Sequence, residues 1–184
     1  MAEVINLSIE EDLAIISFNN PPVNSLGLAV RKGLVEALNA AENNVNVRAI
    51  ILIGEGSTFP AGADIKEFGH PPQEPHLPAI CDKIEKTKKP VISALHGTAL
   101  GGGLEIALSS HYRIASEKTK IGLPEVHLGL LPGAGGTQRL PRLAGIVPAL
   151  KIMTSGGPIS STEALKIGII DKIAEDLLSN AKSF

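Results

Sequence analysis

The stretch VISALHGTALGGGLEIALS, residues 91–109, decides the fold class of this chain. Its first five residues, Val91–Leu95, are a short run of apolar and small side chains, which is typical of a strand buried on both faces of a parallel sheet. A glycine-rich segment follows, and Gly101–Ser109 is then the expected start of a helix. A buried strand that leads through glycines into a helix indicates an α/β fold.

Three consecutive glycines, Gly101–Gly103, stand at the start of this expected helix. Glycine loses more conformational entropy on folding than any other residue, so something beyond turn geometry must require three of them. Either the helix packs very closely on a neighbour, or free backbone N–H groups face a bound group. Glu105 follows in the first turn, where the simplest interpretation is that its carboxylate compensates the helix dipole. The glycine spacing matches neither the dinucleotide fingerprint nor the P-loop.

The order of strand, turn and helix recurs on both sides of this stretch, although no clean sequence period appears. A helix is expected from Ser25, which is placed to cap it, because apolar residues then recur every three or four positions. Ser160 and Glu163 form a capping box before a later helix. The four prolines of His70–Pro78 predict an exposed excursion. The expected strands are Val4–Ile9, Leu13–Phe18, Val47–Ile53, Val91–Leu95, Tyr112–Ala115 and Ile169–Ile173. The other expected helices are Leu77–Thr87, Thr137–Leu143, Pro148–Thr154, Thr162–Ile167 and a tail at Glu175–Ser183.

Two further segments follow expected strands, at the sheet edge where ligands gather in open α/β proteins. In Phe59–Lys66, small residues allow backbone N–H groups to approach a ligand, although a tight turn capped by Asp64 is the simpler interpretation. In Gly122–Leu140, Pro124 fixes the direction of Glu125, although this pair is also common in surface turns. Together, two glutamates and two glycine-rich strand ends converging on one pocket offer two backbone donors for an oxyanion and two carboxylates for proton transfer.

Composition excludes several other classes of function. A net charge of −2 and an aromatic content of 3% argue against nucleic-acid binding. Cys81 is the only cysteine, so no internal disulfide forms and a reducing compartment is expected. The five histidines lack metal-ligand spacing, so no metal site is predicted. The acidic, alternating start Met1–Glu10 is unlike a signal peptide, and no apolar run is long enough for a membrane span. A soluble intracellular domain is therefore expected.

The motifs taken together resemble the crotonase superfamily, the enoyl-CoA hydratase/isomerase family, from about Val4 to Ile173. The resemblance is strongest to the hydratase part of multifunctional fatty-acid β-oxidation enzymes, in which an NAD-dependent 3-hydroxyacyl-CoA dehydrogenase region follows on the same chain. The matching segments, in chain order, are Asn20–Asn24, Ala61–Ile65, Gly101–Glu105, Leu123–Gly129 and Pro132–Leu140.

This resemblance implies a crotonase-like spiral of repeated strand–strand–helix units and the hydration of trans-2-enoyl-CoA to 3-hydroxyacyl-CoA. It implies that the N–H groups of Ala63 and Gly102 form an oxyanion hole for the thioester carbonyl. Glu105 and Glu125 are then expected to hold and deprotonate the water that adds at C3, with proton delivery at C2. Coenzyme A belongs to the substrate, and no separate cofactor is implied. The residues expected to bind substrate or CoA are Val23, Ala61, Gly62, Asp64, Ile65, Lys66, Gly101, Pro132 and Gly133.

Two alternatives remain open beside hydration. One is a Δ3,Δ2-enoyl-CoA isomerase; family members that only isomerise often lack a glutamate at position 105, so the presence of both glutamates favours hydration. The other is a non-catalytic acyl-CoA-binding fragment, because residues 1–184 form one domain that is short for the family and is expected to lack its C-terminal helices. The resemblance also implies a homotrimer or a fusion to a dehydrogenase region. The cytoplasm is the expected location if the source is bacterial, with the peroxisome as the alternative, although the chain does not end in Ser-Lys-Leu.

Overall fold

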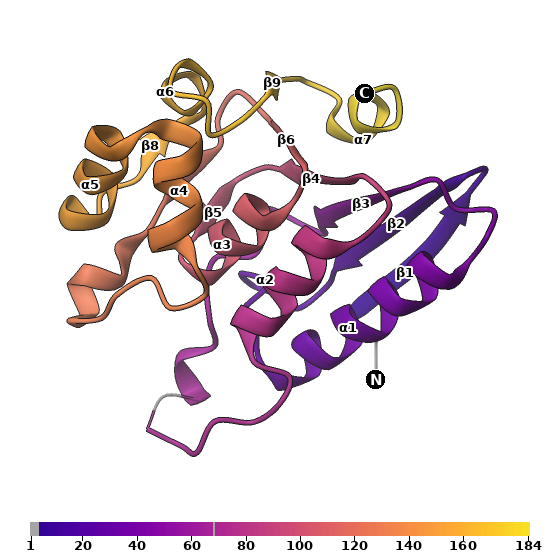
Figure 1. The fold of residues 1–184 in the computed structure, drawn as a ribbon, viewed down its shortest axis with the longest axis horizontal. Helices are drawn as coiled ribbons and strands as arrows, with labels where there is room; N and C mark the ends of the chain where they lie inside the picture. Colours follow the sequence, from indigo (N-terminus) through magenta and orange to yellow (C-terminus); the bar gives the residue numbers. More distant parts are fainter. Residues whose placement is uncertain (1–3, 68) are drawn as a thin grey trace.

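The computed structural model describes residues 4–67 and 69–184, so residues 1–3 and 68 of the expected domain lie outside the described part. The described residues form two sheets with helices around them (Figure 1). The six-stranded sheet has the order β1-β2-β3-β4-β6-β9; β1 is antiparallel to β2, and the other neighbours are parallel. Its strands are Ile5–Glu10 (β1), Leu13–Phe18 (β2), Ala49–Gly54 (β3), Val91–Leu95 (β4), Tyr112–Ala115 (β6) and Lys172–Ile173 (β9).

A smaller three-stranded sheet has the order β5-β7-β8, with β5 parallel and β8 antiparallel to β7. Its strands are Thr98–Leu100 (β5), Lys120–Gly122 (β7) and Ile159–Ser160 (β8). The helices are Leu28–Asn43 (α1), Leu77–Lys86 (α2), Gly102–Ser109 (α3), Gly136–Ala144 (α4), Ile146–Ser155 (α5), Ser161–Lys166 (α6) and Leu177–Lys182 (α7), with 3-10 turns at Ile65–Glu67 (η1) and Pro124–Leu128 (η2). The α/β class expected from residues 91–109 is confirmed.

The large sheet is covered on both faces, which explains its apolar strands. Ile16 of β2 and Leu52 of β3 point into the main core, whereas their neighbours Ile15 and Ile51 point into a second core on the opposite face. Helices α1 to α3 contribute to the main core, and α7 covers the second. Each fully buried aliphatic side chain contributes about 1.5–3 kcal/mol, so a sheet covered on both faces holds its strand ends rigidly.

The first helix does not begin as expected. Ser25 does not cap it, because α1 starts at Leu28 and its N-cap, Gly27, has no side chain to form the bond. Instead the amide of Leu28 donates to Glu67 Oε1 over 2.6 Å, so a carboxylate from η1 satisfies the helix terminus. The Ser25 hydroxyl lies 3.2 Å from the side-chain nitrogen of Asn20. Tertiary contact therefore replaced the local cap that the sequence indicated.

The end of the chain confirms one expectation and corrects another. Ser160 caps α6, accepting a 3.1 Å hydrogen bond from the amide of Glu163. The strand expected at Ile169–Ile173 is only two residues long, Lys172–Ile173. Ile169 is fully buried, and its amide donates to the carbonyl of Ala164, so this part of the apolar run closes the turn after α6. The other expected elements are present, with ends shifted by at most two residues.

The small sheet was not predicted at all, and it positions the candidate site. Its strands have two or three residues, too few to show a periodic pattern. In the parallel pairing of β5 and β7, Leu100 lies opposite Gly122. The carboxyl ends of these strands are therefore adjacent, and the segments that leave them carry Gly102 and Glu125. Within the described ranges, no helix is long and apolar enough to cross a membrane.

Candidate active site

The N-terminus of α3 presents a free backbone amide at Gly102. The carbonyl of Gly101 accepts a 2.9 Å hydrogen bond from the amide of Glu105 and so points along the helix. The N–H of Gly102 belongs to the same trans peptide unit and points the other way, out of the helix. Gly101 has φ +51°, a conformation that favours glycine. A Cβ on Gly103 would collide with the carbonyl of Pro60, so close packing explains the third glycine.

A second free amide lies beside the first. The amide of Leu26 donates a 3.0 Å hydrogen bond to the carbonyl of Gly62, which turns the N–H of Ala63, in the same peptide unit, in the opposite direction. A Cβ placed on Gly102 would lie 3.6 Å from the Ala63 nitrogen, so the two amide groups are neighbours. Neither N–H has a hydrogen-bond acceptor among residues 4–67 and 69–184. The pair can therefore donate to one oxygen atom of a ligand.

Glu105 lies in the first turn of α3 and is 2% exposed. Its Oε1 accepts hydrogen bonds from the amides of Ala134, at 2.7 Å, and Gly136, at 2.8 Å. Burial raises the pKa of this carboxyl, the two amide bonds oppose that rise, and the nearby Glu125 adds to it. The carboxylate is thus fixed in orientation by donors from the start of α4, not merely placed to compensate the dipole of its own helix.

Glu125 lies in η2 directly after Pro124. Its Oε2 is buried without a hydrogen-bond partner among the described residues, and burial raises the pKa of the group. Its Oε1 is 3.1 Å from the position that a Cβ on Gly101 would occupy. Glu125 therefore lies against the turn that presents the Gly102 amide, and a half-buried carboxyl with a free oxygen is suited to proton transfer.

These groups line one cavity of about 420 Å³. It lies where the starts of α2 and α3, the turn η2 and the loop before α4 meet, and most of its wall is apolar. Figure 1 shows α3 between α2 and α4, with its N-terminal end toward the loop that leads into α4. The predicted site residues that line this cavity are Ala61, Gly62, Ala63, Ile65, Gly101, Gly102, Glu105, Glu125 and Gly133.

Four of the predicted residues lie elsewhere. Asp64 and Lys66 line a neighbouring cavity of about 620 Å³, which shares Ala63 with the first. Val23 does not line either cavity, but its carbonyl accepts a 3.1 Å hydrogen bond from the amide of Ala61. Pro132 is buried, where a Cβ on Gly136 would meet its ring carbon at 3.1 Å. Val23 and Pro132 thus support the cavity wall without forming it.

Sequence reasoning did not identify most of the apolar wall. The leucines after Glu125 are exposed on the protein surface, which is unusual for such large apolar side chains and is a signal visible in the run GLLP. The amide donors to Glu105 carry no side-chain signal beyond the glycines around them. The cavity residues that were not predicted as site residues are Leu77, Pro78, Pro124, Leu128, Leu130, Leu131 and Ala134.

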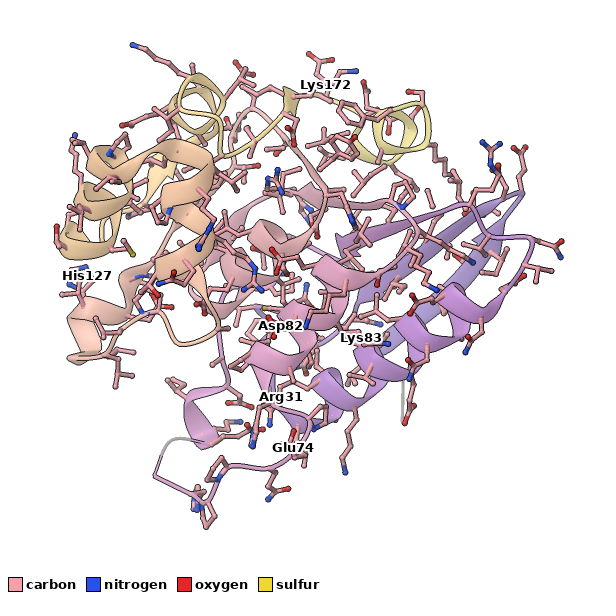
Figure 2. The ribbon with its side chains drawn as sticks, viewed as in Figure 1. Arg31, Glu74, Asp82, Lys83, His127 and Lys172 are labelled. Atoms are coloured by element: carbon pink, nitrogen blue, oxygen red, sulfur yellow. The ribbon has the colours of Figure 1, made fainter. Side chains whose placement is uncertain are left out.

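The histidines and the cysteine do not contribute to this cavity. His127 belongs to η2 but is exposed, and Figure 2 places it at the edge of the molecule. Cys81 is buried in α2, where burial raises the pKa of its thiol to about 12. Within the described part of the chain, no cluster of three or more His, Cys, Asp and Glu side chains could hold a metal ion.

Comparison with known proteins agrees with this architecture. The enoyl-CoA hydratase/isomerase family model matches residues 8–183. The chain is 48% identical over 167 residues to the peroxisomal bifunctional enzyme of Danio rerio, covering 91% of this chain and 23% of the relative. It is 45% identical over 181 residues to a Bacillus subtilis protein named "probable enoyl-CoA hydratase", covering 94% and 69%. The crystal structure of enoyl-CoA hydratase from Bacillus anthracis matches with a TM-score of 0.90 and 36% identity, covering 98% and 73%.

The chain belongs to the enoyl-CoA hydratase/isomerase family. The resemblance to the crotonase superfamily and to multifunctional relatives is thereby confirmed, as is the crotonase-like fold. The chain spans about a quarter of the length of the peroxisomal bifunctional relatives that it matches.

Proposed function

We propose that this chain catalyses the hydration of trans-2-enoyl-CoA to 3-hydroxyacyl-CoA, a step of fatty-acid β-oxidation. One observation carries the proposal: two adjacent free amides, at Ala63 and Gly102, line the same cavity as two carboxyl groups, the buried Glu105 and the half-buried Glu125. Membership of the enoyl-CoA hydratase/isomerase family supports the same activity.

In this proposal the thioester carbonyl oxygen accepts hydrogen bonds from Ala63 and Gly102. Withdrawal of electron density toward that oxygen makes C3 of the conjugated enoyl group electrophilic, and the amides stabilise the enolate that forms when C3 is attacked. Each such donor contributes about 3–4 kcal/mol to the transition state. Both are backbone groups, Gly102 held at the start of α3 and Ala63 by the bond from Leu26 to Gly62, so little reorganisation accompanies the reaction.

In this proposal the two glutamates bind the water molecule and transfer its proton. A carboxylate of the pair takes one proton from water as the water oxygen bonds to C3, and the electrons of the C2=C3 bond move into the enolate. A protonated carboxyl of the pair then supplies a proton to C2, so that one water molecule is added in total. Burial raises the pKa of both carboxyl groups, which favours their taking up a proton, and the fixed carboxylate of Glu105 supports its role in orienting the water.

The CoA portion would extend from the cavity past the backbone of Ala61–Ile65. The neighbouring cavity of about 620 Å³, which Asp64 and Lys66 line, is large enough for part of this moiety. Lys66 is exposed there and is a proposed contact for phosphate charge, with Val23, Gly101, Pro132 and Gly133 proposed to shape the path. Water addition involves no net oxidation or reduction, so we propose that the reaction needs no cofactor; hydration by the purified chain with no added cofactor and in excess EDTA would test this.

The proposal is tested by adding a short trans-2-enoyl-CoA and following the absorbance of the conjugated thioester. We expect the wild type to remove this absorbance and Glu125→Gln and Glu105→Gln to abolish the effect. Glu36→Gln is the matched control, because Glu36 is an exposed residue on the outer side of α1. No loss of absorbance with well-folded wild type would contradict the proposal.

The second candidate function is Δ3,Δ2-enoyl-CoA isomerisation. The unpartnered Oε2 of Glu125 favours it, because one such carboxyl can take a proton from C2 and return it at C4 beside the same amides. A 3-enoyl-CoA substrate distinguishes the two, because an isomerase produces the conjugated thioester without adding water. Acyl-CoA binding in calorimetry, without turnover of either substrate, would instead indicate a binding module.

The oligomeric state and the cellular location of the protein are proposed here from the family resemblance alone. We propose a homotrimer or a fusion with a hydroxyacyl-CoA dehydrogenase region, and light scattering on the purified chain tests the first. The relatives include peroxisomal enzymes and a Bacillus protein, and we propose the cytoplasm if the source is bacterial and the peroxisome otherwise.

A further inference from the structure

The Glu105 carboxylate of α3 is held by the turn that begins another helix, α4. Both amides that bind Glu105 Oε1, those of Ala134 and Gly136, belong to the turn that begins α4. Between them Gly135 has φ +96°, a conformation that favours glycine, and its carbonyl accepts hydrogen bonds from the amides of Gln138 and Arg139. A side-chain contact to the same turn adds to these bonds in directing the two N–H groups at the carboxylate.

Arg139, one turn into α4, reaches back to this loop. Its Nη1 donates a 2.9 Å hydrogen bond to the carbonyl of Ala134, the residue whose amide donates to Glu105. The guanidinium also lies against Gly135, where a Cβ would collide with Nη1. Its side chain is only 11% exposed, and its Nε is buried without a partner among the described residues. A long, charged side chain is thus immobilised directly behind the loop.

The other end of the guanidinium is fixed to α2. Arg139 Nη2 lies 2.9 Å from Asp82 Oδ1 and 2.8 Å from Glu85 Oε2. Figure 2 shows Asp82 on α2, near the middle of the molecule. The first residues of α2, Leu77 and Pro78, line the same cavity as Glu105. One guanidinium therefore links α2 to the loop that holds Glu105.

We infer that Arg139 is a positioning residue for the active site: it holds the turn at residues 134–136 so that two backbone amides fix the Glu105 carboxylate, and it places a positive charge near this buried group. The catalytic consequence rests on the proposed hydration, whereas the effect on Glu105 itself does not.

The charged groups around Glu105 support this role. Glu125 of η2 raises the pKa of Glu105, and Arg139 of α4 lowers it. The Cys81 thiol of α2 also faces Glu105, but with a pKa of about 12 it is neutral near pH 7. Asp82 and Glu85 bind Arg139 and raise its pKa, so the guanidinium keeps its charge. Arg139 is thus the cation among the groups that act on Glu105.

The test compares wild type with Arg139→Gln, which removes the charge, and Arg139→Lys, which keeps the charge but loses the planar fork. Arg142→Gln is the matched control, since Arg142 lies on the same helix but is exposed and bonds back to Gln138. Three quantities are measured: the amide proton shifts of Ala134 and Gly136, the titration of the ¹³C-labelled Glu105 carboxyl assigned with Glu105→Gln, and kcat and KM for hydration.

For Arg139→Gln we expect weakened amide hydrogen bonds, a higher titration midpoint for Glu105 and a kcat lower by about tenfold or more. KM should change by less than about twofold, because Arg139 does not line the cavity. Arg139→Lys should lower kcat and disturb the amides while leaving the midpoint close to that of wild type. Arg142→Gln should match wild type in all three quantities.

Unchanged amide shifts and an unchanged Glu105 midpoint in both Arg139 variants would overturn the inference. If the wild type itself hydrates nothing, the proposed function fails, and the two spectroscopic quantities still decide the role of Arg139. If Arg139→Gln does not fold, Arg139→Lys decides the positioning role through the amide shifts.

Discussion

The amide of Gly101 donates a 2.9 Å hydrogen bond to the carbonyl of Gly122, continuing the parallel pairing of β5 and β7 beyond Leu100. From this bond one segment turns at once into α3 and the other into η2. The free amide of Gly102 and the carboxyl of Glu125 consequently meet at one cavity, although 23 positions separate the two residues in sequence. The two central features of the candidate site are thus aligned by main-chain pairing.

Replacing Gly103 by alanine should destabilise the fold. The added Cβ would collide with the Pro60 carbonyl, and backbone on both sides leaves no flexible group to move. We expect a loss of about 2–3 kcal/mol in the free energy of unfolding, measured by urea denaturation. Gly157→Ala is the control: its Cβ would meet only Ser155 Oγ, at 3.7 Å, so its stability should be unchanged or slightly higher. Equal effects at the two positions would contradict close packing at Gly103.

Removing the guanidinium of Arg31 should loosen the segment before α2. Arg31 is 8% exposed, lies 2.6 Å from Glu67 Oε2, and donates to the carbonyls of Pro75 and Gln73; Figure 2 shows it beside the segment that carries Glu74. We expect Arg31→Leu to cost about 2–3 kcal/mol and to speed amide hydrogen exchange in residues 69–76.

The control for Arg31 is Arg48→Leu. Arg48 also forms an ion pair, with Asp12 at 3.4 Å, but its side chain is 82% exposed. Such a pair contributes less than about 0.5 kcal/mol. If Arg48→Leu lowered the free energy of unfolding as much as Arg31→Leu, then burial and the bonds to carbonyl groups would not explain the contribution of Arg31 to stability.

The stability of the chain should depend on pH through Glu125. Because burial raises the pKa of Glu125 in the folded state above its ordinary value of 4.5, the folded state favours the protonated form. That contribution is fully present below about pH 4.5 and is lost as pH rises through the folded pKa. Glu125→Gln should therefore be more stable than wild type at pH 7.5 and equal to it at pH 4, in denaturant titrations at both pH values. Glu36→Gln is the control, because Glu36 is exposed. A gain in stability at pH 7.5 as large in Glu36→Gln as in Glu125→Gln would contradict the explanation by burial.

The strands of the large sheet and most of the helices around it could be predicted from the sequence. Strands such as Leu13–Phe18 and Val91–Leu95 were predicted with their observed limits, because apolar runs report burial on both faces of a sheet directly. The start of α1 was not, because its terminus is satisfied by Glu67, which lies 39 positions beyond Leu28. Local caps such as Ser160 are visible in sequence, whereas tertiary caps are not.

The residues of the candidate site could likewise be predicted only in part. Glu105, Glu125 and the glycines around them could be identified as a possible set because their segments follow expected strands and together resemble the motifs of one family. Their arrangement could not be worked out from spacing, because the small sheet that aligns them consists of strands too short to show a pattern. Arg139 was missed as well, since an arginine inside a helix gives no indication that its side chain returns to the preceding loop.

The central claim is that two backbone amides and two glutamates in one cavity catalyse the addition of water to an enoyl thioester. The most direct measurement follows the absorbance of a short trans-2-enoyl-CoA with wild type, Glu125→Gln and Glu36→Gln at equal concentration and confirmed fold. The account predicts loss of the conjugated absorbance, with 3-hydroxyacyl-CoA as product, for wild type and Glu36→Gln, and no loss for Glu125→Gln. Equal rates for wild type and Glu125→Gln, or no product from the folded wild type, would contradict it.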